Sequence, residues 1–256
     1  MSTAKLEIWP AVGKNFRSLG ESFYSSIIRY PWMLAIGAFA GYLLGEVRMY
    51  GSQNAMNMYW ILTLATLILL AFIGCRHSHE VITRDKQAYP SVGRGLKYFI
   101  FGLILIVVIT GVALAGSVIG FIGVSGEFGG GVTIWTLLIG VSWIVAIYLS
   151  SRVILVLPAI AVGNSQTGFK RSWELTKGSE WRVIAILLIT YIIMAFIMAI
   201  PDMLSEFLLG GDMLGILLGG AILWWTQLVT TLFMAEVTAR IFVFFLKPDM
   251  YPEYLN

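Results

Sequence analysis

The sequence predicts an all-helical polytopic membrane protein with six transmembrane helices, and composition and segment length together predict this class. Of its 256 residues, 58% are hydrophobic and only 12% are charged, and the mean hydropathy is +0.84. Soluble domains carry about a quarter charged residues. A spanning helix needs about 20 apolar residues, so the chain has room for about six spans with short connections. We therefore expect one membrane domain over 1–256 and no large soluble domain.

Six apolar segments are long enough to be considered as spans. The first has a charge-free core of 15 residues, which rises only about 22 Å and is shorter than a hydrocarbon core of about 30 Å. It crosses only if Arg29 and Glu46 lie near opposite interfaces. The fourth and sixth are longer than a crossing needs, which predicts that their ends continue as kinked or interfacial helix. The predicted spans cover about 31–49, 56–75, 98–124, 132–162, 183–204 and 213–246.

Basic residues predict the orientation of these spans. Six alternating crossings place both termini and the loops 76–97 and 163–182 on one side of the membrane. Of the 17 Lys and Arg residues, 16 fall on that side and only Arg48 falls on the other. Lys and Arg concentrate on the cytoplasmic side of membrane proteins, so both termini are predicted to be cytoplasmic. Orientation thus explains the net charge of +3 without a nucleic-acid partner.

Amphipathic segments are expected on the cytoplasmic side. Residues 10–29 place apolar side chains at spacings of three and four, with basic side chains on the opposite face. This pattern is typical of a helix in the headgroup zone. Such a helix either orients the first span or senses a lipid or partner. A similar pattern follows in the 163–182 loop. The expected interfacial side chains are Phe16, Phe23, Phe169, Trp173 and Trp181.

Two glycine triplets predict close helix contacts. In each triplet the glycines stand four residues apart, so they share one helix face on which a second backbone can approach. The contact is made either with another helix of the same chain or with a second copy of the chain. The triplets are Gly37, Gly41 and Gly45 in the first span and Gly211, Gly215 and Gly219 at the start of the sixth.

Two ionisable residues are expected near the cytoplasmic boundary, Arg152 in the fourth span and Glu236 in the sixth. Glu236 is flanked by apolar residues, where a charge is costly unless it is paired or hydrated. Its candidate partners are Arg240, one turn further along the same helix, and Arg152 across the bundle. We expect a structural ion pair, and the alternative is a relay for protons or substrate.

The sequence predicts no catalytic residue, no cofactor and no metal site. Cys75, His77, His79 and Glu80 are metal-ligand residue types, but no second Cys or His group exists in the chain. Structural zinc sites typically use paired ligand groups, so we expect these residues to be solvated at a helix exit. The sequence also has no phosphate-binding glycine loop, dinucleotide fingerprint or nucleophile elbow. The single cysteine excludes an internal disulfide.

The segment from Arg152 to Ala159, followed by Ser172, Trp173, Thr176, Gly178 and Trp181, carries a family resemblance. It resembles a family of bacterial six-helix membrane proteins related to the membrane domain that precedes the catalytic part of some glycerophosphodiester phosphodiesterases. The resemblance is most specific over 152–200. It implies a membrane domain in which an interfacial helix leads into the fifth span. It implies no activity, because a phosphodiesterase barrel would need about 250 further residues.

These observations predict a non-catalytic protein of the bacterial inner membrane. We expect an accessory, assembly or scaffold subunit, with the lipid bilayer and a membrane or envelope protein, or a second copy, as partners. The alternative is a small-molecule or lipid transporter or channel, which would need a polar path through the middle of the membrane. An intramembrane enzyme or an enzyme anchor is a third reading. The predicted third and fifth spans carry no charge over 98–124 and 183–200, which argues against ion conduction.

Overall fold

The computed structural model is helical, without a strand, over the part of the chain that it describes. That part comprises residues 13, 17, 20, 24, 28–85, 89–125, 132–208 and 213–246. The predicted interfacial helix over 10–29, with Phe16 and Phe23, lies mostly outside it. The helices are α2 (Trp32–Tyr50), α3 (Gln53–Thr83), α4 (Val92–Ser125), α5 (Val132–Val153), α6 (Val156–Val162), α7 (Phe169–Thr176), α8 (Glu180–Leu208) and α9 (Met213–Leu246).

The predicted fourth span is divided into α5 and α6. The helix breaks at Ile154 and Leu155, just before Pro158. A proline ring clashes with the carbonyl group four residues earlier, here that of Ile154, and proline has no N–H to donate. Proline is tolerated in the first turn of a new helix, which is where α6 places it. The break lets the chain change direction between α5 and α7.

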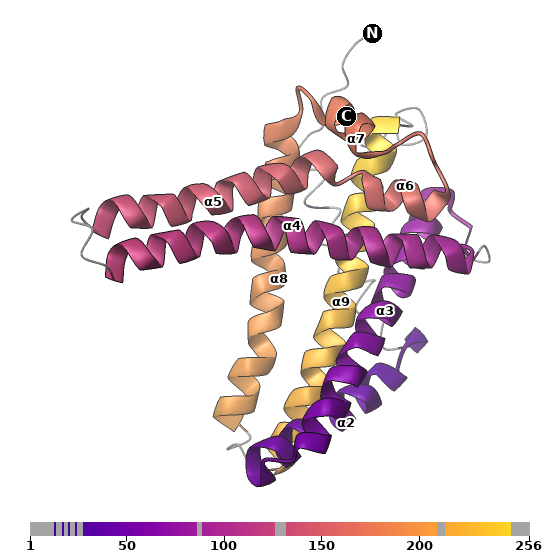
Figure 1. Ribbon diagram of the computed structural model, residues 1–256. Helices are drawn as coiled ribbons and strands as arrows, with labels where there is room; N and C mark the ends of the chain where they lie inside the picture. The colour runs from indigo at the N-terminus through magenta and orange to yellow at the C-terminus, as the bar shows by residue number, and fades with distance from the viewer. Residues whose placement is uncertain are drawn as a thin grey trace.

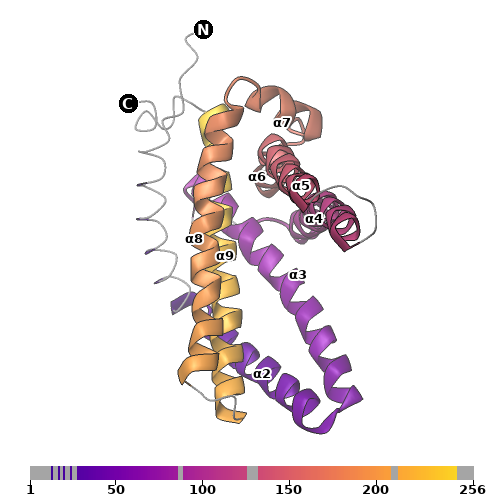
Figure 2. The same cartoon turned by 90° about the vertical axis from the view of Figure 1, so that its left-hand side faces the viewer.

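Helices α2, α3, α8 and α9 run between the same two ends of the molecule (Figures 1 and 2). The α2–α3 turn lies at the end where α8 finishes and α9 starts. Helix α9 is the centre of this bundle, because it packs against α2, α3 and α8. Its residues Leu228, Phe233 and Val237 are completely buried. The core is therefore built around α9.

Helices α4 and α5 form an antiparallel hairpin that lies across the direction of α8 and α9 (Figure 1). Only the base of the hairpin packs on the bundle. There, Tyr98 of α4 clusters with Cys75 of α3 and Ala161 of α6, and Ser150 of α5 lies beside Tyr191 of α8. The rest of the hairpin extends away from the bundle. Six parallel spans are therefore not the arrangement that the structure has.

The chain is a multi-pass helical membrane protein. Five segments are long and apolar enough to cross a membrane, and α2, with 19 residues, is not one of them. The sixth span thus stays a prediction from the sequence. The five segments are Gln53–Thr83, Val92–Val112, Ile139–Val162, Glu180–Ala199 and Met213–Leu246.

The glycines of α2 lie directly against α9. A Cβ atom on Gly37 would come within 2.7 Å of the Cα atom of Ala221, and one on Gly41 within 2.5 Å of the Ile216 carbonyl oxygen. A Cβ atom on Gly45 would meet Met213 Sδ at 2.8 Å. The first two contacts are with backbone atoms, so no side-chain rotation relieves them. The first triplet thus packs within the chain, where backbone approach drives helix association in lipid.

The close approach on α9 is made by Gly220, which the sequence analysis did not single out. A Cβ atom there would lie 2.6 Å from the Gly37 carbonyl oxygen. Of the predicted second triplet, Gly215 is buried, Gly219 is partly buried, and Gly211 lies outside the described residues. Neighbouring residues of an α-helix are turned by about 100° around its axis, so Gly219 does not share the face of Gly220.

We predict that Gly41→Ala destabilises the protein, because the added methyl group forces the α2 and α9 backbones apart. Overpacking typically costs about 1–3 kcal/mol. The matched control is Gly111→Ala in α4, where nothing lies within 4 Å of an added Cβ. That change should be neutral or stabilise the helix by up to about 1 kcal/mol. Thermal unfolding in detergent measures both, and equal stability of the two variants would contradict the contact.

Candidate functional site

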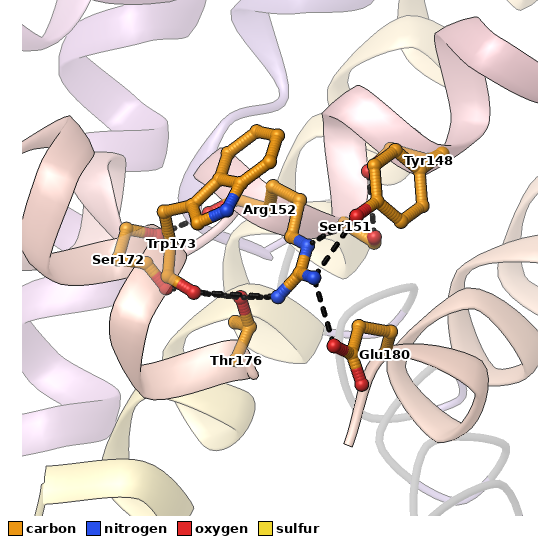
Figure 3. A network of polar contacts seen from close by, with 7 residues as sticks. All are labelled: Tyr148, Ser151, Arg152, Ser172, Trp173, Thr176 and Glu180. Carbon is orange, nitrogen blue, oxygen red and sulfur yellow. Dashed lines mark hydrogen bonds and ion pairs between the residues drawn. The ribbon is translucent and has the colours of Figure 1, made fainter. Parts of the chain in front are cut away.

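The most connected polar group of the described chain is Arg152, near the end of α5 (Figure 3). Its Nε and Nη2 atoms donate to the Tyr148 hydroxyl at 3.1 and 2.9 Å. Nη2 also donates to a carboxylate oxygen of Glu180 at 2.8 Å. Tyr148 lies one turn earlier on α5, whereas Glu180 is the first residue of α8. The guanidinium group therefore ties α5 to α8.

The same arginine also holds the short helix α7. Its Nη1 atom donates to the Trp173 carbonyl oxygen at 3.3 Å and to the Thr176 hydroxyl at 3.4 Å. In the opposite direction, the Ser172 hydroxyl donates to the Arg152 carbonyl oxygen at 2.7 Å. Both the backbone and the side chain of Arg152 thus take part in the contact (Figure 3).

Two aromatic rings flank the guanidinium group. Its carbon lies 5.1 Å from the ring centre of Tyr148 and 4.9 Å from that of Trp173. The rings meet edge to face, with their centres 5.9 Å apart. Arg152 is only 6% exposed. Because arginine remains charged at every accessible pH, burial at this depth requires both the carboxylate and the surrounding acceptors. This site is called the arginine node below.

The arginine node gathers the residues on which the family resemblance rests. Arg152, Ser172, Trp173 and Thr176 meet in it, although 24 positions separate the first from the last. Gly178 has φ +88°, in the left-handed region that favours glycine, and makes the turn between α7 and α8. This turn brings Glu180 back to α5. The motif therefore encodes a junction of three helices.

A second polar cluster lies where α3 and α9 approach their C-terminal ends. Glu236, 7% exposed, is paired with Arg240 one turn further along α9. His77 Nε2 of α3 lies 3.7 Å from the other carboxylate oxygen. Of the two partners that the sequence left open, the structure places Arg240 beside Glu236 and places Arg152 at Glu180. The sequence analysis did not consider Glu180, which lies in the segment that it treated as a loop.

A third ion-paired group joins α3 to the segment before α2. Glu80 accepts hydrogen bonds from Arg76, at 2.8 Å, and from Arg29, at 3.1 Å. The Arg76 guanidinium group also lies over the ring of Tyr89, 4.0 Å from its centre. This group fixes the position at which the chain enters α2. With the second cluster it forms a charged layer at one end of the bundle.

The side chains with metal-ligand chemistry point to different partners. Cys75 is completely buried beside Tyr98, and the ring of His79 contacts the Ala161 carbonyl oxygen at 3.1 Å. His77 faces Glu236. These residues are thus packed or paired and not solvated as expected, because α4, α6 and α9 cover this end of α3. In the described residues no three His, Cys, Asp or Glu side chains are grouped so that they could hold a metal ion.

The predicted interfacial side chains of the 163–182 region lie on the surface around the arginine node. Phe169 and Trp173 are both 41% exposed, and Trp181 is 79% exposed. The Phe169 ring also packs near Phe101 of α4, with the ring centres 5.6 Å apart. Lys170 and Arg171 are exposed beside them. This mixture of aromatic and basic side chains is typical of the membrane–water interface.

Comparison of the chain with protein-family models, with curated proteins and with solved structures gives no match. The resemblance of residues 152–200 to the phosphodiesterase membrane domain therefore stays a prediction. What the arrangement can do follows from the geometry alone. The three polar groups join helices to one another, and each uses its charges within the chain.

We predict that Arg152 and Glu180 are energetically coupled. Removing one member of a buried ion pair leaves an uncompensated charge and typically costs about 3–5 kcal/mol. The double variant Arg152→Gln with Glu180→Gln should therefore lose less stability than the sum of the single variants. Arg152→Gln with Glu236→Gln is the control pair. Because these two residues share no contact, their losses should add within about 0.5 kcal/mol.

Denaturant unfolding in detergent measures this double-mutant cycle. The pair Glu236→Gln with Arg240→Gln provides a second coupled cycle, because these side chains contact each other. Additive losses for Arg152 and Glu180 would show that the arginine node does not hold α5 and α8 together. Strong coupling between Arg152 and Glu236 would contradict the separation of the two sites.

Proposed function

We propose that this chain is a non-catalytic accessory, assembly or scaffold subunit for a membrane or envelope partner. The observation that carries the proposal is the arginine node, in which a buried charge serves to join α5, α7 and α8. The other two polar groups join helices in the same way. A protein whose buried charges hold helices in place is suited to presenting a fixed helical surface to a partner.

The exposed apolar side chains support a role in helix association. Trp60 and Ile61 on α3 are 61% and 69% exposed, and Phe196 on α8 is 72% exposed. Trp143 on α5 is 53% exposed. In a bilayer these side chains face lipid or a partner helix, and helices there associate through packing. The chain therefore offers several separate apolar faces to a partner or to a second copy.

The alternative function is transport of a small molecule or lipid, with Glu236 and His77 as a relay. The depth of Glu236 favours a structural role. It lies 23 residues beyond Met213, the first residue of α9, which corresponds to about 35 Å along the helix. A hydrocarbon core of about 30 Å therefore ends near this residue. A relay would require such a group nearer the middle of the membrane.

We further propose that the protein resides in a bacterial inner membrane with both termini in the cytoplasm. The bacterial assignment rests on the resemblance over 152–200, and the orientation rests on the 16 basic residues on one side. This orientation requires only an even number of crossings. It holds for the six predicted spans, and it also holds for four if α4 and α5 do not cross.

Cysteine labelling in intact cells tests the orientation. In a Cys75→Ala background, an impermeant thiol reagent should modify Asn54→Cys at the start of α3 and should spare Ser165→Cys between α6 and α7. Both positions are exposed, so accessibility differs only through the membrane. Opening the cells should make Ser165→Cys reactive. The reverse pattern would overturn the orientation.

Site-specific photo-crosslinking tests the scaffold proposal. Benzoylphenylalanine placed at Trp60, Trp143 or Phe196 should give a protein adduct of defined size from at least one of these three faces. The matched control is Phe233, which is completely buried and should give no intermolecular adduct. Lipid adducts alone from all three exposed positions would contradict a protein partner.

A further inference from the structure

The α4–α5 hairpin has a direction that its composition does not explain. We infer that the hairpin does not cross the membrane and instead lies within the leaflet on the side of the charged layer, with lipid acyl chains covering its apolar surface. Three observations carry this inference: the direction of the bundle, the level at which the hairpin leaves it, and the chemistry of its exposed faces.

The bundle defines the direction of the membrane normal. From Gln53 to Arg76, α3 advances 23 residues without a charge, and from Met213 to Glu236, α9 does the same. Each stretch is about 35 Å long, close to the thickness of a hydrocarbon core of about 30 Å. Both stretches end in the charged layer. The helices of the bundle therefore cross the membrane, and the charged layer marks one of its boundaries.

The hairpin leaves the bundle directly beneath the charged layer. On α3 it packs at Gly74 and Cys75, immediately before Arg76, through the ring of Tyr98. On α8 it packs where Ser150 meets Tyr191. From this level α4 and α5 run across the bundle direction (Figures 1 and 2). A helix pair at this depth and in this direction stays on one side of the membrane centre.

The exposed faces of the hairpin require a hydrocarbon environment. From 98 to 151 the only charged residue is Glu127. A helix in the headgroup zone has a polar face, whereas a helix that is apolar on all sides is buried in protein or lipid. Side chains all around α4 and along α5 are exposed and apolar. They are Leu103, Ile104, Ile106, Val107, Val108, Leu114 and Val118, and Leu137, Val141, Trp143, Ile144 and Val145.

The length of α4 agrees with this position. Its 34 residues extend about 51 Å, well beyond the thickness of a hydrocarbon core of about 30 Å. A helix in the plane of a leaflet has no such limit on its length. Naming this leaflet cytoplasmic rests on the proposed orientation, but the position of the hairpin in one leaflet does not. It is also independent of the scaffold proposal.

Depth measurement by spin labelling tests the inference. Val107→Cys and Val118→Cys, in a Cys75→Ala background, place two labels 11 residues apart on one exposed face of α4. The protein is reconstituted in vesicles of phosphatidylcholine and phosphatidylglycerol, and accessibility to oxygen and to a water-soluble nickel chelate gives the depth of each label. The matched control is Ile192→Cys with Met203→Cys on α8, which are also exposed and 11 residues apart.

We expect the two α4 labels to have the same depth and high oxygen accessibility, and the α8 labels to differ by about 16 Å along the membrane normal. Leu103→Cys and Leu114→Cys give a second α4 pair with the same spacing, should the first fail to fold. A depth difference in α4 equal to that in α8 would overturn the inference in favour of a crossing hairpin. Labels that oxygen cannot reach would overturn it in favour of a protein partner on these faces.

Discussion

The structure depends on the requirement that every charge near the membrane boundary be paired and hydrogen-bonded within the chain. Arg152 illustrates the strength of this constraint, because its guanidinium group uses a carboxylate, two hydroxyl groups, a carbonyl group and two aromatic rings. Lipid offers no replacement for these partners. Positioning α7 and α8 around α5 therefore follows from satisfying a single side chain, and apolar packing then fills the space between the helices.

Packing along the bundle follows a different rule from pairing at its end. Between α2 and α9 no polar side chain is needed, because glycines allow the two backbones to touch. Dispersion between closely packed helices replaces the hydrophobic effect, which does not act between helices in lipid. The protein thus combines two kinds of contact. Charges fix the helix ends at one boundary, and close backbone packing fixes α2 against α9 from there to the other.

Local patterns predicted the helices and the packing face of α2, since glycines four residues apart share one side of a helix. Gly220 could not be identified in this way, because only the register between α2 and α9 selects it over Gly219. Glu180 was missed because its partner, Arg152, lies 28 residues away and meets it only through the turn at Gly178. The direction of α4 and α5 was missed because hydropathy reports the surrounding medium and not the orientation of a helix axis.

The hairpin is attached to the bundle at one end only, and this attachment has a mechanical consequence. A pair of helices that lies in one leaflet displaces lipid area from that leaflet and none from the other. With a helix diameter of about 10 Å and a length of about 50 Å, the pair occupies on the order of 1,000 Å². Many copies in one patch of membrane would expand one monolayer relative to its opposite. The bilayer would then bend toward the side that contains the hairpins, which gives this protein a geometric influence on its membrane without any chemical step.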